Sequence, residues 1–346
     1  MKKNNRNIDQ KSRQKSKKGK KGAKRFSTLT LVSFFIFELI FTACIFPFML
    51  LYGPFENAKS TYVGAAMTSL SHQYLAKMFL SDEKIAKILG QNSIETTDET
   101  TNTAQIEIPK VKDETIERYD IVDNTKYTGY YLVIKDSTRV KIGYTSKLQV
   151  EGETTSQIAE NNDAIAAING GGFTDKSSNQ EWTGNGGFPT GIIMNGGKII
   201  YNDLEKDKET DLIAITKEGV MLVGKYSAEK LQELEVQEAL SFGPSLVING
   251  KMTSMSGDGG WGIAPRTVIG QRKDGAIILL VIDGRGVSSL GATLKEAQEV
   301  IYKLGAVNAM NLDGGKSTTM YYDSDIINTP SFSMGERSVP TAIIVK

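Results

Sequence analysis

Four glycine-flanked clusters carry most of the side chains in this sequence that could do chemistry. Each cluster borders an apolar run and places Asn, Arg, Asp or Thr close to a glycine. A glycine at a strand end lets a ligand approach the backbone and exposes amide donors to an anion. Arginine adds bidentate recognition of phosphate, and aspartate can serve as acid, base or nucleophile. The clusters are residues 168–173, 186–191, 264–270 together with 281–285, and 310–319.

The single histidine and the single cysteine exclude several other kinds of chemistry. With only His72 and Cys44 in 346 residues, the chain has no intramolecular disulfide, no cysteine-based zinc site and no histidine-pair metal site. A nucleotide-binding P-loop at Gly315-Lys316-Ser317 is excluded because Met310 stands where that motif requires glycine. No cofactor or metal is predicted: clustered Asp and Asn oxygens suit Ca²⁺, but their spacing gives no support for a site.

The near-zero net charge is the sum of two parts with opposite charge. Residues 1–25 hold twelve Lys/Arg and one acid, for a charge of +11, whereas the remaining residues sum to −10. Residues 28–52 form an apolar run with one charge, Glu38, and would extend about 37 Å as a helix, enough to span a membrane. The basic flank then predicts a cytoplasmic N-terminus and an extracellular body, and argues against nucleic-acid binding by the tail.

Two alternatives to a membrane anchor remain open at this stage. A cleaved signal peptide has a weak candidate site at Ala65-Ala66, and residues 41–44 loosely resemble a lipoprotein processing site that ends at Cys44. The predicted organisation is a basic cytoplasmic tail, a transmembrane helix, a helical juxtamembrane stalk, a flexible linker and a folded domain. Their respective ranges are 1–27, 28–52, 53–90, 91–112 and 113–346.

The folded part reads as a mixed α+β domain with largely antiparallel sheet and few helices. Hairpin turns are expected at 195–197, 217–219 and 273–275, each between two apolar runs. Helices are expected at 227–240 and at 293–304, the second with a Thr293–Glu296 capping box and Gly305 at its end. The expected strands are 130–136, 139–145, 164–170, 191–200, 211–224, 245–250, 267–283, 307–312, 318–323 and 341–346.

The clusters together resemble the phosphodiester glycosidase family over roughly residues 120–346. One departure is Lys316, where that family more often has a small residue; this lysine could contact phosphate or point to solvent. The motifs that carry the resemblance are ING-x-x-F (168–173), GG-x-P-x-G (186–191), PRT-x-IG (265–270), DGR (283–285), NLDGG-x-ST (311–318) and the closing Arg337.

The resemblance implies hydrolysis of a sugar-1-phosphodiester in an envelope or exopolysaccharide glycan. Asp313 is the expected base or nucleophile, with Asp283 second. The phosphate is already a good leaving group, so recognition of its charge matters most. The expected substrate-binding residues are Asn169, Gly170, Gly171, Arg266, Thr267, Arg285, Asn311, Gly314, Gly315, Ser317, Thr318 and Arg337.

Two other function classes remain open. A non-catalytic protein that binds or assembles such polymers could use the same fold, since fold alone does not determine function. A hydrolase that attacks the phosphorus rather than the sugar carbon is the third reading. Partners expected from the sequence are a membrane and a phosphate-linked glycan, with no nucleic acid.

Overall fold

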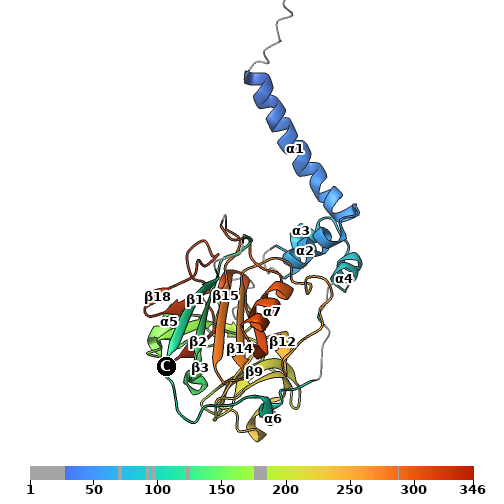
Figure 1. Cartoon of the computed structure of the whole chain (residues 1–346). Helices are drawn as coiled ribbons and strands as arrows, with labels where there is room; N and C mark the ends of the chain where they lie inside the picture. Colours follow the sequence, from blue (N-terminus) through green and yellow to red (C-terminus); the bar gives the residue numbers. More distant parts are fainter. Residues whose placement is uncertain are drawn as a thin grey trace, which may run out of the picture. The chain divides into compact units, whose positions relative to one another are not determined.

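The computed structural model (Figure 1) describes residues 28–68, 72–90, 94, 99–121, 125–174, 185–286 and 288–346. Contacts between residues divide the chain into two compact units, Met1–Met49 and Leu50–Lys346. The predicted basic tail, 1–27, lies outside the described residues.

Helix α1 (Thr28–Tyr52) confirms the long apolar helix expected over residues 28–52. Nearly all of its side chains are exposed, including Cys44, and its mean hydropathy reaches 2.3. By length and composition this helix could cross a membrane, and a signal sequence near the N-terminus would have the same properties.

Three short helices occupy the predicted helical segment before residue 90. They are α2 (Glu56–Met67), α3 (Tyr74–Lys77) and α4 (Asp82–Gly90), and α4 begins directly after Ser81, as the sequence indicates. Leu51, Val63, Ala76 and Ile85 belong to a small apolar core that these helices share. The helices also pack on the body, because an added Cβ on Gly64 in α2 would lie 2.7 Å from Gly260 O.

The described strands pair antiparallel throughout, which confirms the predicted sheet class. The largest sheet has seven described strands in the order β1-β2-β15-β14-β16-β12-β13. These strands are β1 (Ile116–Ile121), β2 (Gly129–Ile134), β15 (Ile277–Ile282), β14 (Arg266–Arg272), β16 (Ala306–Leu312), β12 (Ser245–Ile248) and β13 (Lys251–Met252).

Two five-stranded sheets and one short strand pair complete the described sheet structure. The first is β10 (Met221–Tyr226), β9 (Thr210–Ile215), β11 (Glu238–Ser241), β7 (Ile192–Asn195) and β8 (Lys198–Asn202). The second is β18 (Asp325–Ile326), β17 (Met320–Tyr322), β4 (Ala166–Asn169), β19 (Thr341–Val345) and β3 (Val140–Tyr144). The pair is β5 (Phe173–Thr174) with β6 (Phe188–Pro189).

The main core lies between the sheets, and a second core lies under helix α7 (Leu294–Lys303). Ile269 of β14 packs in the main core, whereas the adjacent Val268 packs in the second core with Leu294 and Ile301 of α7. Figure 1 shows α7 against β14 and β15. Both faces of β14 and β15 are buried. The sequence of β15 is a continuous apolar run, whereas β14 combines Val268 and Ile269 with buried polar residues such as Thr267 and Gln271.

Local signals for turns and caps are confirmed. The turns at 195–197, 217–219 and 273–275 join β7 to β8, β9 to β10 and β14 to β15. Both halves of the Thr293–Glu296 capping box form, and a second such box, Thr154–Gln157, begins α5 (Thr155–Asn161). Three 3₁₀ turns connect other elements: η1 (Thr103–Gln105), η2 (Ser137–Arg139) and η3 (Gly315–Ser317).

Two local expectations are wrong. The predicted helix 227–240 ends early, because α6 (Ala228–Glu233) is followed by β11, whose residues pair with β9 and β7. The described part of the expected flexible linker is bound to the body. The Thr101 hydroxyl accepts from Val223 N at 2.8 Å, and Glu107 N donates to Lys273 O at 2.8 Å. Residues 91–93 and 95–98 lie outside the described residues.

Candidate functional site

Antiparallel register brings the candidate residues to one end of the large sheet. Arg266 and Thr267 open β14, opposite Ile282 at the end of β15 and Leu312 at the end of β16. Asp283 and Asp313 are the next residues along β15 and β16. Both aspartates therefore leave the sheet at the same end, one on each side of β14.

Asn169, at the end of β4, joins a second sheet to this end. Its Oδ1 accepts from Thr267 Oγ1 at 2.8 Å and from Thr319 N at 3.2 Å, and its Nδ2 donates to Asp313 O at 2.5 Å. Asn169 and Thr267 are fully buried. Both were expected to bind substrate, but their polar groups are used within the protein, so they position the loop that carries Asp313.

Three of the four glycine amides expected to bind an anion donate within the protein. Gly170 N donates to Thr341 O at 3.0 Å, Gly171 N to Thr341 Oγ1 at 3.0 Å, and Gly315 N to Pro265 O at 2.9 Å. A Cβ on Gly170 would lie 2.6 Å from Thr341 Oγ1, and one on Gly314 would lie 2.7 Å from Pro265 O. These glycines allow strands and loops to pack closely, and anion recognition falls to side chains instead.

The two candidate carboxylates have different surroundings. The carboxylate of Asp283 accepts from Asn328 Nδ2 at 2.9 Å and from Thr329 N at 3.0 Å. Its exposed fraction is 4%, and burial raises its pKa, although these hydrogen bonds oppose the shift. Asp313 is only half-buried, and its backbone is fixed at both ends by Asn169 and by Gly170 O. Asp283 therefore holds the turn at 328–329, whereas Asp313 is less buried overall, with its Oδ2 shielded from solvent.

Arg266 is a buried support for a loop. Its Nε donates to Ala292 O at 3.0 Å, and its Nη2 donates to Trp261 O at 3.1 Å and to Gly262 O at 2.6 Å. The residue is 3% exposed, and burial lowers its pKa to about 10. This geometry favours positioning of the Trp261–Gly262 loop over the predicted contact with phosphate.

Replacing Arg266 with lysine is expected to lower the free energy of unfolding by about 2–5 kcal/mol. A lysine ammonium lacks the planar fork that reaches several carbonyl oxygens at once, so buried acceptors lose their donors. Urea unfolding of R266K against wild type measures the change, with the half-exposed Arg272→Lys as the matched control. Wild-type stability combined with a raised KM would instead assign Arg266 to direct substrate binding.

Three other cations lie near the clusters, and they differ in their contacts. Arg285 is exposed and has a left-handed backbone (φ 62°), and within the described residues its guanidinium makes no hydrogen bond or ion pair. This guanidinium lies beside Gly315, because a Cβ there would be 3.5 Å from Arg285 Nη2. Lys316 Nζ lies 5.9 Å from the ring centre of Phe332, and the Arg337 guanidinium lies 4.7 Å from that of Phe173. Arg285 is therefore the cation best placed to receive an anion.

Several buried polar atoms around the Asp313 loop lack partners. Asn311 Nδ2 donates to Gly243 O at 2.9 Å, but Asn311 Oδ1, Ser317 Oγ and Thr319 Oγ1 have no hydrogen-bond partner among the described residues. Thr318 Oγ1 is within 3.3 Å of Thr267 Oγ1. A buried polar atom without a partner costs free energy. Such atoms therefore suit a polar ligand or ordered solvent.

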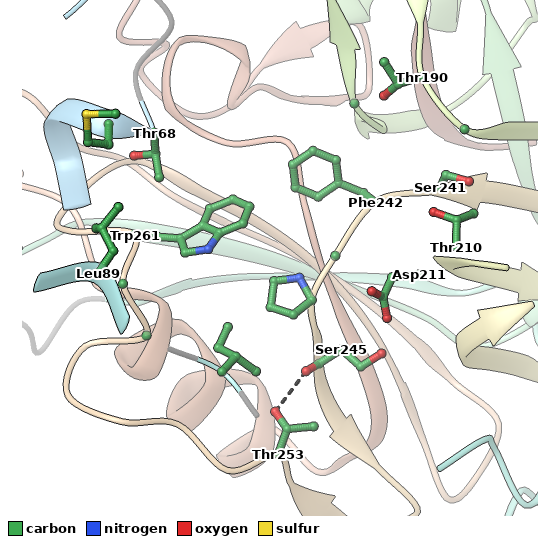
Figure 2. Close-up of a pocket in the computed structure, with 18 of the residues that line it drawn as sticks. Thr68, Leu89, Thr190, Thr210, Asp211, Ser241, Phe242, Ser245, Thr253 and Trp261 are labelled. Carbon is green, nitrogen blue, oxygen red and sulfur yellow. Dashed lines mark hydrogen bonds between the residues drawn. The ribbon is translucent and has the colours of Figure 1, made fainter. Parts of the chain in front are cut away.

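A cavity of about 1010 Å³ lies beside this loop system. It touches the candidate site at Gly172, Gly243 and Pro244, the last two of which Asn311 holds through its Nδ2 and backbone N–H. Figure 2 shows Phe242 and Trp261 side by side in the cavity, with Asp211 and Thr210 on the side opposite Thr68 and Leu89. The two rings meet edge to face, with their centres 6.0 Å apart.

Sequence reasoning missed Asp211, Phe242 and Trp261 as candidate site residues. The available signal was the same as for the other clusters, since Phe242 lies in a Ser-Phe-Gly-Pro-Ser run and Trp261 in a Gly-Gly-Trp-Gly run. Asp258 directly precedes the second run, whereas no Arg, Asn or Asp adjoins the glycine of the first. Within the part of the chain that the structure describes, no group of three His, Cys, Asp or Glu side chains could hold a metal ion.

Comparison with known proteins assigns the family. The family model for phosphodiester glycosidases matches residues 162–346, more than half of the chain. The chain belongs to the phosphodiester glycosidase family. The match covers the clusters from Asn169 to Arg337 and all of β4 to β19, including the Asp313 loop and Arg285.

Curated proteins similar to this family member include one from bacteria and one from human. The SPbeta prophage-derived uncharacterized protein YomE of Bacillus subtilis is 27% identical over 217 residues, covering 60% of this chain and 31% of that protein. The human N-acetylglucosamine-1-phosphodiester alpha-N-acetylglucosaminidase is 27% identical over 172 residues, covering 42% of this chain and 33% of that protein. The chain therefore spans about a third of the length of these relatives.

One solved structure supports the fold of this family member. The catalytic domain of the zebrafish N-acetylglucosamine-1-phosphodiester alpha-N-acetylglucosaminidase, auto-inhibited by its pro-peptide, aligns with a TM-score of 0.57 at 22% identity. The alignment covers 71% of this chain and 87% of that one. At this identity the likeness concerns the fold alone.

Proposed function

We propose that this protein hydrolyses the bond between a sugar C1 and the bridging oxygen of a phosphodiester, with Asp313 as base or nucleophile. The observation that carries the proposal is the position of Arg285. Its guanidinium, which has no partner among the described residues, lies beside Gly315, two residues after Asp313. An anion-binding group near the loop that carries a reactive carboxylate is what cleavage of a sugar-1-phosphodiester requires.

The proposed reaction needs little help from a general acid. The C1–oxygen bond breaks, and the bridging oxygen leaves with the phosphate as a phosphomonoester, whose growing negative charge Arg285 stabilises. Water adds to C1 and gives up a proton. As a base, Asp313 accepts this proton; as a nucleophile, Asp313 first forms a glycosyl ester with C1, leaves as the carboxylate when water attacks, and the proton passes to solvent. Asn311, Ser317 and Thr318 are proposed to orient sugar hydroxyls or phosphate oxygens. Asp283, Asn169, Thr267 and Arg266 act through the loops that they hold.

The family and the names of two relatives support this substrate class. The bovine N-acetylglucosamine-1-phosphodiester alpha-N-acetylglucosaminidase is 38% identical over 69 residues, covering 20% of this chain and 13% of that protein. Together with the human relative, it indicates a sugar phosphodiester rather than an ordinary glycoside. The proposal for this chain goes further, to phosphate-linked glycans of a cell envelope or exopolysaccharide.

We place the catalytic part outside the cell on a membrane anchor. The apolar helix α1 follows a tail of charge +11, an order that favours a cytoplasmic N-terminus. The proposed domain order is tail, single span, helical segment 53–90, connecting segment 91–112 and catalytic body 113–346. A phosphate-linked envelope glycan would then lie on the same side of the membrane as the active site.

Hydrolysis in oxygen-18 water tests the proposed bond cleavage. The full-length protein in detergent, incubated with a panel of sugar-1-phosphodiesters, is expected to release free sugar carrying the label and unlabelled phosphomonoester. Asp313→Asn serves as the inactive control. Label in the phosphate product would assign attack at phosphorus. Absence of both products over the whole panel would favour the alternative, a non-catalytic protein that binds or assembles envelope polysaccharide.

A further inference from the structure

The cavity beside the candidate site has a distinct chemical character. Among the described residues that line it are six hydroxyl side chains, Asp203, Asp211, Phe242 and Trp261, whereas Lys, Arg and His are absent from its lining. The six hydroxyl side chains are those of Thr68, Thr190, Thr210, Ser241, Ser245 and Thr253. Hydroxyls and carboxylates match the hydroxyls of a sugar, and a lining whose described charged side chains are both carboxylates disfavours phosphate.

The cations lie elsewhere in the same site region. Arg285 lies beside Gly315, and neither residue lines the cavity. The cavity and the region around Arg285 are connected through the loops that follow β4 and β11. Gly172 and Gly243 of these loops line the cavity, and Asn311 Nδ2 donates to Gly243 O. Charge thus separates two neighbouring regions, one suited to an anion and one suited to an uncharged polyol.

We propose that this cavity binds the uncharged glycan part of the substrate, with Trp261 and Phe242 as the platform and Asp211 as a hydrogen-bonding group. The inference rests on the proposed function and adds the orientation of the substrate: sugar toward Trp261, phosphate toward Arg285. Aromatic rings supply large apolar contact area with little loss of side-chain freedom, which suits the C–H face of a pyranose ring. A volume of about 1010 Å³ exceeds the needs of one monosaccharide.

Asp211 is suited to contact hydroxyl groups. It lies at the start of β9, and its backbone carbonyl accepts from Phe242 N at 3.2 Å, which fixes it next to the aromatic pair. Burial raises the pKa of its carboxyl, and the charge of Lys225 opposes the shift. Donation from sugar hydroxyls to this carboxylate would compensate for its partial desolvation.

The helices that follow α1 build one wall of this cavity. Met67 and Thr68 at the end of α2 and Leu89 of α4 line it. Helix α2 also packs closely against the Trp261 loop, since a Cβ on Gly262 would lie 2.5 Å from Ala65 N. Arg266 holds the same loop from the opposite side through Trp261 O. Met67, Thr68 and Leu89 are therefore part of the proposed substrate-binding structure.

Tryptophan fluorescence tests the inference directly. The sequence has one other tryptophan, Trp182, so W182F leaves Trp261 as the single reporter. Titration of full-length W182F with N-acetylglucosamine, N-acetylgalactosamine, glucose and galactose is expected to give a saturable change in emission with at least one of them, and none with inorganic phosphate. F242A and D211A should weaken the affinity for that sugar about tenfold or more, and Y302A, an exposed aromatic on α7, should not.

The outcomes separate this inference from the proposed function. A response to phosphate alone, or no response to any of the four sugars, overturns the sugar assignment even if the enzyme is active. Saturable sugar binding without hydrolysis supports the cavity assignment and contradicts only the catalytic proposal. For an active enzyme, W261A is expected to raise KM about tenfold or more, and an unchanged KM also overturns the inference.

Discussion

Replacing Asp313 with asparagine is expected to lower kcat/KM for a sugar-1-phosphodiester by about 10²–10⁴-fold, the range for removing a positioned acid–base group. Asn has nearly the same shape, so it keeps the backbone contacts of this position, Asn169 Nδ2 to Asp313 O and Asp313 N to Gly170 O. The loop should therefore stay folded, while the protein loses the carboxylate charge that is proposed to act at the sugar C1. Released free sugar, measured at saturating and at low substrate concentration, gives the two kinetic constants.

Asp283→Asn is the matched control for Asp313→Asn. Both residues follow a strand of the same sheet at the same end, but the Asp283 carboxylate already accepts from Asn328 and Thr329. Its replacement is expected to lower the free energy of unfolding by about 1–3 kcal/mol because a buried donor loses its acceptor, with a smaller loss of activity. A folded D283N that loses as much activity as D313N would make Asp283 a catalytic residue, and an unimpaired D313N would remove Asp313 from the mechanism.

Local signals were sufficient for much of the fold. The hairpin turns between β7 and β8, β9 and β10, and β14 and β15 need glycine at positive φ, and the sequence shows it in each. The α7 cap likewise depends on two residues three positions apart. The helix predicted over 227–240 failed because its second half pairs with β9 and β7, and such long-range pairing overrides helical propensity.

The roles of site residues depended on contacts that sequence spacing does not reveal. Gly170 and Gly171 looked like anion donors, but Thr341, some 170 residues away, takes their N–H groups. Arg266 looked like a phosphate ligand, yet burial turns its guanidinium toward backbone carbonyls. The Trp261 cavity is lined by residues from many separate parts of the chain, from Met67 to Trp261, so no single motif marks it. The strand ends were predictable, and the direction of each side chain was not.

Replacing Arg285 with alanine is expected to lower kcat/KM by about 10²–10³-fold, the usual effect of removing one donor that stabilises developing charge. The residue is exposed and without hydrogen bonds or ion pairs among the described residues, so its loss should leave the free energy of unfolding within about 0.5 kcal/mol of wild type. Replacement of Arg285 should thus lower activity with little change in stability. Replacement of Arg266 should mainly lower stability, because its guanidinium is buried and hydrogen-bonded.

Chemical rescue distinguishes a lost charge from a disturbed loop. Added guanidinium ion at low concentration is expected to restore part of the activity of R285A, because the space beside Gly315 would accept a planar cation. R285K should retain more activity than R285A but less than wild type, since an ammonium binds phosphate as a point charge without the bidentate fork. Arg272→Ala, which removes only a surface ion pair with Asp274 at 3.2 Å, is the matched control and should be active without rescue. If R285A is as active as R272A, phosphate recognition must be assigned to Lys316 or Arg337, and the proposed orientation of the substrate changes with it.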